Sequence, residues 1–306
     1  MIHALLVLIA VFFDYLLGEP KRYHPLAGFG RLAVMLEGML YGTTTPPGAY
    51  LRLAGLFAWV MLIAPFVLLS AWLASIPMLG YGFEVLFLYL ALGASSLALH
   101  ARTVAHALKQ RRLNFAREHV AMMVSRETKE LDETGVSRAT IESVLENGND
   151  AIFAALFWFT VLGAPGVVMY RLANTLDAMW GYRDDRYRYF GWASARIDDL
   201  LNWVPARLTA LTYILVGRTR QGLRCWRRQA PQWYGMNPGV VMSSGAGAMN
   251  VTLGGAARYH GQLKQRPLLG AGQAPTVEDI ERSVLFVQRG QWLWLAVIFC
   301  GAWAIA

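Results

Sequence analysis

Residues 53–101 have the sequence LAGLFAWVMLIAPFVLLSAWLASIPMLGYGFEVLFLYLALGASSLALHA. These 49 residues between Arg52 and Arg102 contain one charged side chain, Glu84. A helix needs about 20 apolar residues to cross a bilayer, so the stretch is long enough for two membrane helices, which we place at 53–75 and 83–100. A soluble helical hairpin would need a polar face, which is missing here. The turn residues between the two segments predict a hairpin with both ends on one side of the membrane.

Three other segments are also apolar. Residues 1–17 lack the basic start and the small-residue cleavage site of a signal peptide, so we expect a retained membrane segment. Residues 290–306 are uncharged and contain three tryptophans, which is typical of a membrane helix with interfacial aromatics. Residues 151–170 are uncharged too, but Gly163-Ala164-Pro165-Gly166 interrupts them. This run is either a simple span or a re-entrant or interfacial helix pair.

The composition of the whole chain agrees with a membrane protein. Hydrophobic residues make up 56% of the 306 residues and charged residues 16%, which argues against a disordered chain, a disulfide-rich module and an ordinary soluble enzyme. Cys225 and Cys300 are far apart and show no zinc spacing. We predict an all-α polytopic integral membrane protein with about four to five membrane segments plus the re-entrant or interfacial helix pair. It would form one domain over 1–306, with helical cytoplasmic parts at 101–150, 171–207 and 218–289.

The basic residues indicate the topology. The net charge is +8, and 101–150 carries eight Lys/Arg, 171–199 five, and 207–228 six with no acid, whereas the turn 76–82 carries none. Cytoplasmic segments are enriched in Lys and Arg, so we expect the long polar segments in the cytoplasm and the turn outside. Basic segments on both sides of 151–170 also favour a run that bends back at Gly163–Gly166 rather than crossing.

Carboxylates recur at helical spacing before this run. Glu142, Glu146 and Asp150 lie at i, i+4 and i+8, on one face of a predicted helix. Ser137 is the expected start of that helix, as its capping residue. The face is either a magnesium or ammonium site, since hard cations take oxygen ligands, or a solvated acidic surface. Its position beside an apolar segment, where stray carboxylates are costly, favours a site.

A second group of acids and amides follows the run. Asn174 and Asp177 lie at i, i+3, and Asp198 and Asn202 at i, i+4, with Asp199 adjacent. Pro205 should break or kink the helix there. The flanking arginines, Arg196 and Arg207, make this either a site at the membrane surface or a structural ion-pair cluster.

Two further patterns have two interpretations each. Arginines and tyrosines alternate over 182–189, which suits binding of phosphate or carboxylate or anchoring at lipid headgroups. Glycines recur over 243–255, where the backbone could approach a phosphate or helices could pack closely. The Gly-Lys-Ser/Thr of a Walker loop is missing. Residues 262–280 are predicted to form a loop.

Ordered motifs extend along nearly the whole chain, and together they resemble the adenosylcobinamide-phosphate synthase family, CobD/CbiB. The matching pieces are Asp14, Gly18-Glu19-Pro20, His24-Pro25, Ser125-Arg126-Glu127-Thr128, Glu142–Asp150, Leu156-Phe157-Trp158, Gly163–Gly166, Tyr170-Arg171, Asn174–Asp177, Gly181-Tyr182-Arg183, Asp198–Trp203, Pro205–Leu208, Leu253-Gly254-Gly255, Tyr259 and Gly261. The chain departs from the family pattern at Glu127, Asn149, Ala155 and Gly235–Gly239.

The resemblance implies a membrane enzyme of cobalamin biosynthesis. It would use ATP and Mg²⁺ to join a propionate of adenosylcobyric acid, a corrinoid substrate, to the amine of (R)-1-aminopropan-2-yl phosphate (aminopropanol phosphate) or ethanolamine phosphate. It would lie in the bacterial cytoplasmic (inner) membrane with its active site facing the cytoplasm. Its partners would be the lipid bilayer and other membrane-bound enzymes of nucleotide-loop assembly, and no nucleic acid.

The same chemistry assigns roles to groups of residues. We expect the catalytic base and metal ligands among Glu146, Asp150, Asp177, Asp198 and Asp199, with Glu146, Asp150 and Asp177 holding Mg²⁺. We expect substrate and phosphate binding by Arg126, Asn147, Arg171, Asn174, Arg183, Arg196, Asn202 and Arg207. All of them would gather in one pocket at the inner leaflet.

Two other functions are compatible with a polytopic membrane chain. One is a non-catalytic signalling protein of the related AmpE type, which should lack this density of acidic, amide and arginine motifs. The other is a corrinoid transporter, against which the absence of an internal sequence repeat argues.

Overall fold

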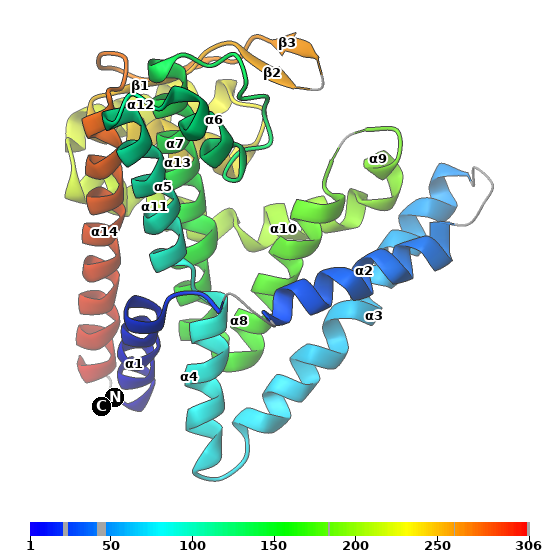
Figure 1. Ribbon diagram of the computed structural model, residues 1–306. Helices are drawn as coiled ribbons and strands as arrows, with labels where there is room; N and C mark the ends of the chain where they lie inside the picture. Colours follow the sequence, from blue (N-terminus) through cyan, green and yellow to red (C-terminus); the bar gives the residue numbers. More distant parts are fainter. Residues whose placement is uncertain (21–23, 42–46, 183, 260, 305–306) are drawn as a thin grey trace. The chain divides into compact units, whose positions relative to one another are not determined.

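The computed structural model describes residues 1–20, 24–41, 47–182, 184–259 and 261–304. They form two compact units (Figure 1). Unit 1 consists of Met1–Gly93, Ala154–Asn202 and Ile298–Ala306, and unit 2 of Ala94–Phe153 and Trp203–Val297. Both units are discontinuous in sequence, because the chain leaves each one and returns to it. The division does not test the prediction of one domain, which stays a prediction.

In the described part of the chain, four helical stretches are long and apolar enough to cross a membrane. They are α3 (Gly48–Ala74), Leu79–Lys109, Glu133–Trp180 and α14 (Val277–Ala304). The shorter helices α1 (Ile2–Leu17) and α11 (Trp203–Val216) are also apolar. This architecture confirms the prediction of an all-α polytopic membrane protein.

The predicted hairpin is present in unit 1, but its second segment, predicted at 83–100, is interrupted, because one helix ends at Ala91 and α5 (Ala94–Lys109) begins a new one after the extended residue Leu92. Helix α3 is followed by α4 (Leu79–Ala91), and a tight turn at the lower end of Figure 1 joins them. A Cβ on Gly80 would lie 2.1 Å from the carbonyl oxygen of Ala74, so only glycine permits this approach. Helix α3 begins at Gly48 rather than at 53, because Arg52 is accommodated inside it: its guanidinium lies over the rings of Tyr189 and Trp192, at 5.5 and 5.6 Å.

Helix α8 (Ala154–Trp180) reverses direction at its glycine-rich centre. Gly163 has φ +65°, a left-handed conformation that favours glycine. A Cβ on Gly166 would lie 2.4 Å from the carbonyl oxygen of Trp158, although residues eight apart in a continuous helix are separated by about 12 Å. The predicted bend at Gly163–Gly166 is therefore confirmed, while its location within the membrane stays a prediction.

The core of unit 1 is aromatic. Tyr170, Trp180 and Phe190 are fully buried, and the rings of Trp180 and Phe190 meet edge to face with centroids 5.0 Å apart. Burying one such side chain contributes about 2–3 kcal/mol to stability. These residues bring α8 together with α2 (Pro25–Tyr41), α9 (Tyr187–Phe190) and α10 (Trp192–Leu201).

A buried carboxylate reinforces this core. Glu37 of α2 accepts hydrogen bonds from Trp180 Nε1 at 3.0 Å and from Arg186 Nε at 2.8 Å. The guanidinium of Arg186 also lies 5.1 Å from the centroid of Tyr41. The hydrogen bonds to Glu37 raise the pKa of Arg186. Arg186 of the arginine- and tyrosine-rich segment therefore has a structural partner.

Unit 2 is built on close helix packing. Its helices include α5 (Ala94–Lys109), α6 (Leu113–Ala121), α7 (Glu133–Gly148), α12 (Thr219–Gln229) and α13 (Met236–Met249), with a π-helical turn at Asn149–Phe153 and a 3₁₀ turn at Ala230–Gln232. A Cβ on Gly245 would press on Leu145, and one on Gly247 on Cys225, each within 2.9 Å. Gly245 and Gly247 thus serve helix packing, which confirms the packing interpretation at these two positions.

Short strands replace part of the predicted 262–280 loop. Strand β1 (Thr252–Gly254) pairs antiparallel with β4 (Leu268–Gly270), and β2 (Ala257–Tyr259) with β3 (Gln262–Lys264). Gly254 and Gly255 have φ of +78° and +79°. The loop prediction was therefore wrong at β3 and β4. Each of these strands has three residues, which is too short for an alternation of apolar and polar side chains to be recognised in the sequence.

Three predicted boundaries also differ from the structure. Helix α7 begins at Glu133, not at Ser137, because the side chain of Asp132 accepts the N–H of Gly135 at 2.7 Å and caps the helix. Helix α14 begins at Val277 rather than at 290, since its polar first turns continue the apolar helix. The helix is interrupted at Asn202, between α10 and α11, rather than at Pro205. Pro205 lies in the first turn of α11, where proline is tolerated.

Replacing Gly163 should destabilise the protein. Gly163→Ala would place a side chain at positive φ, 3.1 Å from Glu84 Oε1, and we expect a loss of about 1–3 kcal/mol. The measurement is the thermal unfolding midpoint in detergent. Gly82→Ala is the control, because a Cβ at Gly82 of α4 meets nothing within 4 Å. An unchanged midpoint for Gly163→Ala would contradict the role of the bend.

Cysteine labelling tests the topology that the bend implies. With Cys225 and Cys300 replaced, single cysteines at the exposed positions Lys129 and Arg188 should both resist an impermeant maleimide in intact cells and react after lysis. A cysteine at Met78, in the exposed turn before α4, should react in intact cells. Reaction of positions 129 and 188 from opposite sides would show that 151–170 crosses.

Candidate functional site

A cluster of amides and carboxylates lies in unit 1, and we call it the α8–α10 cluster. The carboxylate of Asp198 accepts from Asn174 Nδ2 at 3.3 Å and from Asn202 Nδ2 at 3.1 Å. The hydroxyl of Tyr170 donates to Asn202 Oδ1 at 3.0 Å. The predicted pairs Asn174/Asp177 and Asp198/Asn202, which are 24 residues apart along the chain, are therefore brought together.

Asp177 completes this cluster. It lies beyond the uncharged run 151–170, on the polar last turns of α8, within electrostatic reach of Asp198 and Asp199. Carboxylates so close together repel each other unless a cation lies between them. A carboxylate in such a group can also accept a proton from a bound ammonium ion.

The donors of the α8–α10 cluster suit a hard divalent cation. Carboxylate and amide oxygens are ligands of Mg²⁺, which keeps several waters and takes one or two protein carboxylates together with substrate phosphates. Among the described residues, no three His, Cys, Asp or Glu side chains are grouped as a metal site. The donor chemistry thus fits Mg²⁺ held jointly with a phosphorylated substrate rather than by a protein cage.

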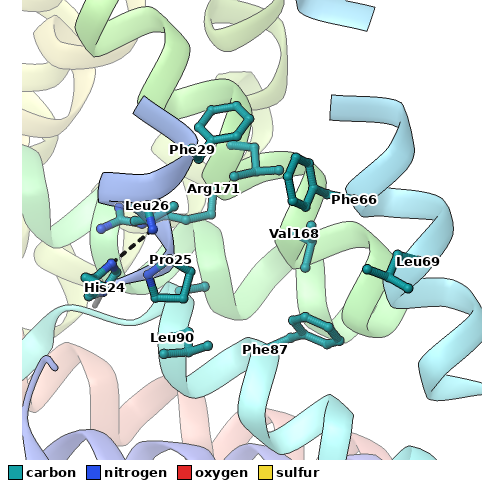
Figure 2. A pocket seen from close by; sticks show the side chains of 12 residues that line it. His24, Pro25, Leu26, Phe29, Phe66, Leu69, Phe87, Leu90, Val168 and Arg171 are labelled. Carbon is teal, nitrogen blue, oxygen red and sulfur yellow. Dashed lines mark hydrogen bonds between the residues drawn. The ribbon is translucent and has the colours of Figure 1, made fainter. Parts of the chain in front are cut away.

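A cavity of about 160 Å³ lies in the same unit (Figure 2). Its wall is mostly apolar, with His24 and Arg171 as its polar members. In Figure 2 these two lie toward the start of α2, and Phe66, Leu69 and Phe87 lie on the opposite side. The Nε of Arg171 is buried and has no hydrogen-bond partner among the described residues. The lining residues are His24, Pro25, Leu26, Phe29, Phe66, Leu69, Phe87, Leu90, Ala91, Val168, Arg171 and Leu172.

A second cluster lies in unit 2 around Glu142 of α7, and we call it the Glu142 cluster. Glu142 forms ion pairs with Arg126 and with Arg266, whose Nη1 is 3.0 Å from Oε2. The side chains of Glu142, Arg126 and Arg266 are 3%, 7% and 6% exposed. The other carboxylate oxygen, Oε1, accepts the backbone N–H of Gly254 at 2.7 Å. One buried carboxylate thus fixes the turn after β1 and two distant arginines.

Glu146 lies one turn further along the same face. Its charge lies within electrostatic reach of Glu142, Arg126 and Arg266. Asn147 donates to the carbonyl and hydroxyl oxygens of Ser143, both at 3.0 Å. The predicted stripe of acids on one helix face therefore exists as far as Glu146.

Asp150 lies in the π-helical turn that follows. It accepts from Asn149 Nδ2 at 2.8 Å, and Asn149 in turn accepts from the hydroxyl of Thr209 at 2.9 Å. Its side chain belongs to unit 2, as do Glu146 and Arg126, whereas Asp177, Asp198 and Asp199 belong to unit 1. The gathering of both sets in one pocket stays a prediction.

The remaining predicted arginines have different surroundings. Arg207 donates to Asn237 Oδ1 at 2.8 Å and lies over Trp203, and burial lowers the pKa of Arg207. Arg196 is exposed and forms no hydrogen bond or ion pair with the described residues. Arg183 lies outside the described residues.

Several residues of these clusters were absent from the predicted set. Glu142 was on the predicted acidic face, and its position four residues before Glu146 was the available signal. Glu37 sits in an otherwise apolar helix, where a lone acid signals a buried partner. Arg266 gave no such signal, because a single arginine in a polar loop is ordinary.

Comparisons with known proteins identify the family of the chain. The model of the family described as CobD/Cbib protein matches residues 7–287. A protein of Chromobacterium violaceum named cobalamin biosynthesis protein CobD is 59% identical over 303 residues, 98% of this chain and 96% of its own. The chain belongs to the CobD/CbiB family.

Other relatives carry the same name. One from Stutzerimonas stutzeri is 57% identical, covering 97% of each chain, and one from Mycobacterium tuberculosis is 40% identical, covering 93% of this chain and 92% of its own. No solved structure matches. The resemblance of the motifs to CobD/CbiB is thus confirmed over nearly the full length.

Proposed function

We propose that the protein is an adenosylcobinamide-phosphate synthase. It would form an amide between a propionate of adenosylcobyric acid and the amine of (R)-1-aminopropan-2-yl phosphate or ethanolamine phosphate, with ATP as the energy source. Membership of the CobD/CbiB family and the names of its relatives support a place in cobalamin biosynthesis. The observation that carries the chemistry is the α8–α10 cluster, in which two amides hold Asp198 beside Asp177.

A carboxylate must be activated before it reacts with an amine. In the proposed route, an oxygen of the propionate attacks the γ-phosphorus of ATP, forming an acyl phosphate and releasing ADP. The uncharged amine nitrogen then attacks the acyl carbon, and phosphate leaves with the electrons of the C–O bond. The amine arrives as an ammonium ion, and each amide formed also releases a proton, so a base is needed.

Asp177 is suited to be that base. It lies within electrostatic reach of Asp198 and Asp199, so an ammonium group bound at this cluster would lie close to a carboxylate that can accept its proton. Asp198 cannot rotate freely, since Asn174 and Asn202 hold both of its oxygens. A fixed carboxylate of this kind can orient an ammonium group or share a Mg²⁺ ion with phosphate oxygens, and that ion would neutralise charge on the transferred phosphoryl group.

The cavity of unit 1 supports binding of an amphipathic substrate. A corrinoid carries methyl groups at its edge beside carboxylate and amide side chains. We place an apolar edge of the corrinoid against the cavity wall and a carboxylate on the Nε of Arg171, whose donor has no other described partner. The site would face the cytoplasm across a bacterial inner membrane, where ATP is available.

Asp198→Asn should separate the synthase from the alternatives. With purified protein, ATP, Mg²⁺, adenosylcobyric acid and aminopropanol phosphate, we expect the wild type to release ADP and amide product together. Asp198→Asn keeps the size of the side chain and removes its charge, so kcat should fall about 100-fold or more. The exposed Asp185→Asn should retain activity.

The proposal would be refuted if the wild-type protein moved corrinoid into vesicles without forming a covalent product. That result would favour a transporter. Protein that neither forms product nor moves corrinoid would favour a signalling role of the AmpE type.

A further inference from the structure

The Glu142 cluster contains more positive than negative charge. Arg126 and Arg266 are both almost fully buried and both face one carboxylate, that of Glu142. Glu146, the second acid within electrostatic reach, forms no ion pair with either arginine among the described residues. Buried charges are costly unless they are paired. One paired carboxylate therefore faces two buried guanidiniums.

A third arginine adds to this imbalance. Arg138 lies on α7 one turn before Glu142, so the two side chains share a helix face. Its Nε is buried and has no hydrogen-bond partner among the described residues. A buried donor left without an acceptor costs about 1–3 kcal/mol. Arg138 thus presents a donor for which the fold supplies no acceptor.

Glycine leaves room beside Arg138. Gly255 has φ +79°, and a Cβ built there would lie 3.8 Å from Nη1 of Arg138 and 3.5 Å from a methyl carbon of Leu268. No side chain therefore separates the guanidinium from this turn. The neighbouring residues Ser125 and Gln265 are exposed, so the cluster lies close beneath the surface of the unit.

We propose that Arg126, Arg138 and Arg266, gathered at the Gly254–Gly255 turn, bind the phosphate group of a phosphorylated substrate. Guanidinium groups hold phosphate through paired N–H···O contacts, and a dianion matches the surplus of positive charge. A metal cation is disfavoured by three guanidiniums. A carboxylate would neutralise only one of them. Assignment of the ligand to a substrate rests on the proposed function, whereas phosphate binding itself does not.

Arg138 gives the sharpest test, because its guanidinium forms no ion pair with the residues that the structure describes. Binding of ATP, aminopropanol phosphate and inorganic phosphate is measured by calorimetry at fixed salt, without corrinoid. At least one should bind the wild type, and Arg138→Gln should weaken that binding about 10- to 100-fold. Arg138→Lys, which keeps the charge, should lie between the two. The ligand most affected identifies the source of the phosphate.

A matched control removes the effect of net charge. Arg227→Gln changes an exposed arginine of α12 in the same unit, and it should leave binding unchanged. Without ligand, Arg138→Gln should also raise the thermal unfolding midpoint, since an unsatisfied buried charge is removed. A purely structural arginine would lower it.

The results separate this inference from the proposed reaction. Phosphate binding that depends on Arg138 in protein that forms no amide would support the site and reject the synthase. The opposite result is protein that forms the amide but whose phosphate binding is unchanged by Arg138→Gln, or is weakened equally by Arg227→Gln. That result would reject the site and retain the synthase. Absence of binding by all three probes would also overturn the site.

Discussion

The pairing of buried carboxylates with distant donors is the constraint on which both units depend. Glu142 holds two arginines and the backbone of Gly254 in unit 2, and Glu37 holds Trp180 and Arg186 in unit 1. An unpaired charge in either position would cost several kcal/mol. Each carboxylate therefore specifies which parts of the chain must meet. Apolar contacts between helices are less specific, because they have no direction.

This constraint separates structural from chemical polar groups. Glu142 and Glu37 are saturated by donors inside the protein, so neither is free to react. Asp177 and Glu146 accept no hydrogen bond at their side chains from the part of the chain that the structure describes. Arg138 and Arg171 have buried donors without described partners. The groups that the fold leaves unsatisfied are the ones best suited to meet substrates.

The sequence alone was sufficient for the membrane helices and for pairs of polar residues at helical spacing. Long apolar runs and i, i+4 patterns are local, so Asp198/Asn202 and the bend at Gly163 could be predicted from them. Contacts between remote segments could not, because nothing near Arg266 indicates Glu142 and nothing near Arg186 indicates Glu37. The short strands at 252–270 were missed for a related reason: three-residue strands carry almost no periodic signal.

The separation between Glu37 and Arg186 has a consequence for synthesis. The two residues are 149 positions apart, so at 5–20 residues per second the ribosome makes Glu37 roughly 7 to 30 s before its partner exists. During that interval helix α2 carries a carboxylate that nothing yet neutralises. We therefore expect α2 to complete its docking only after Trp180 and Arg186 have been synthesised.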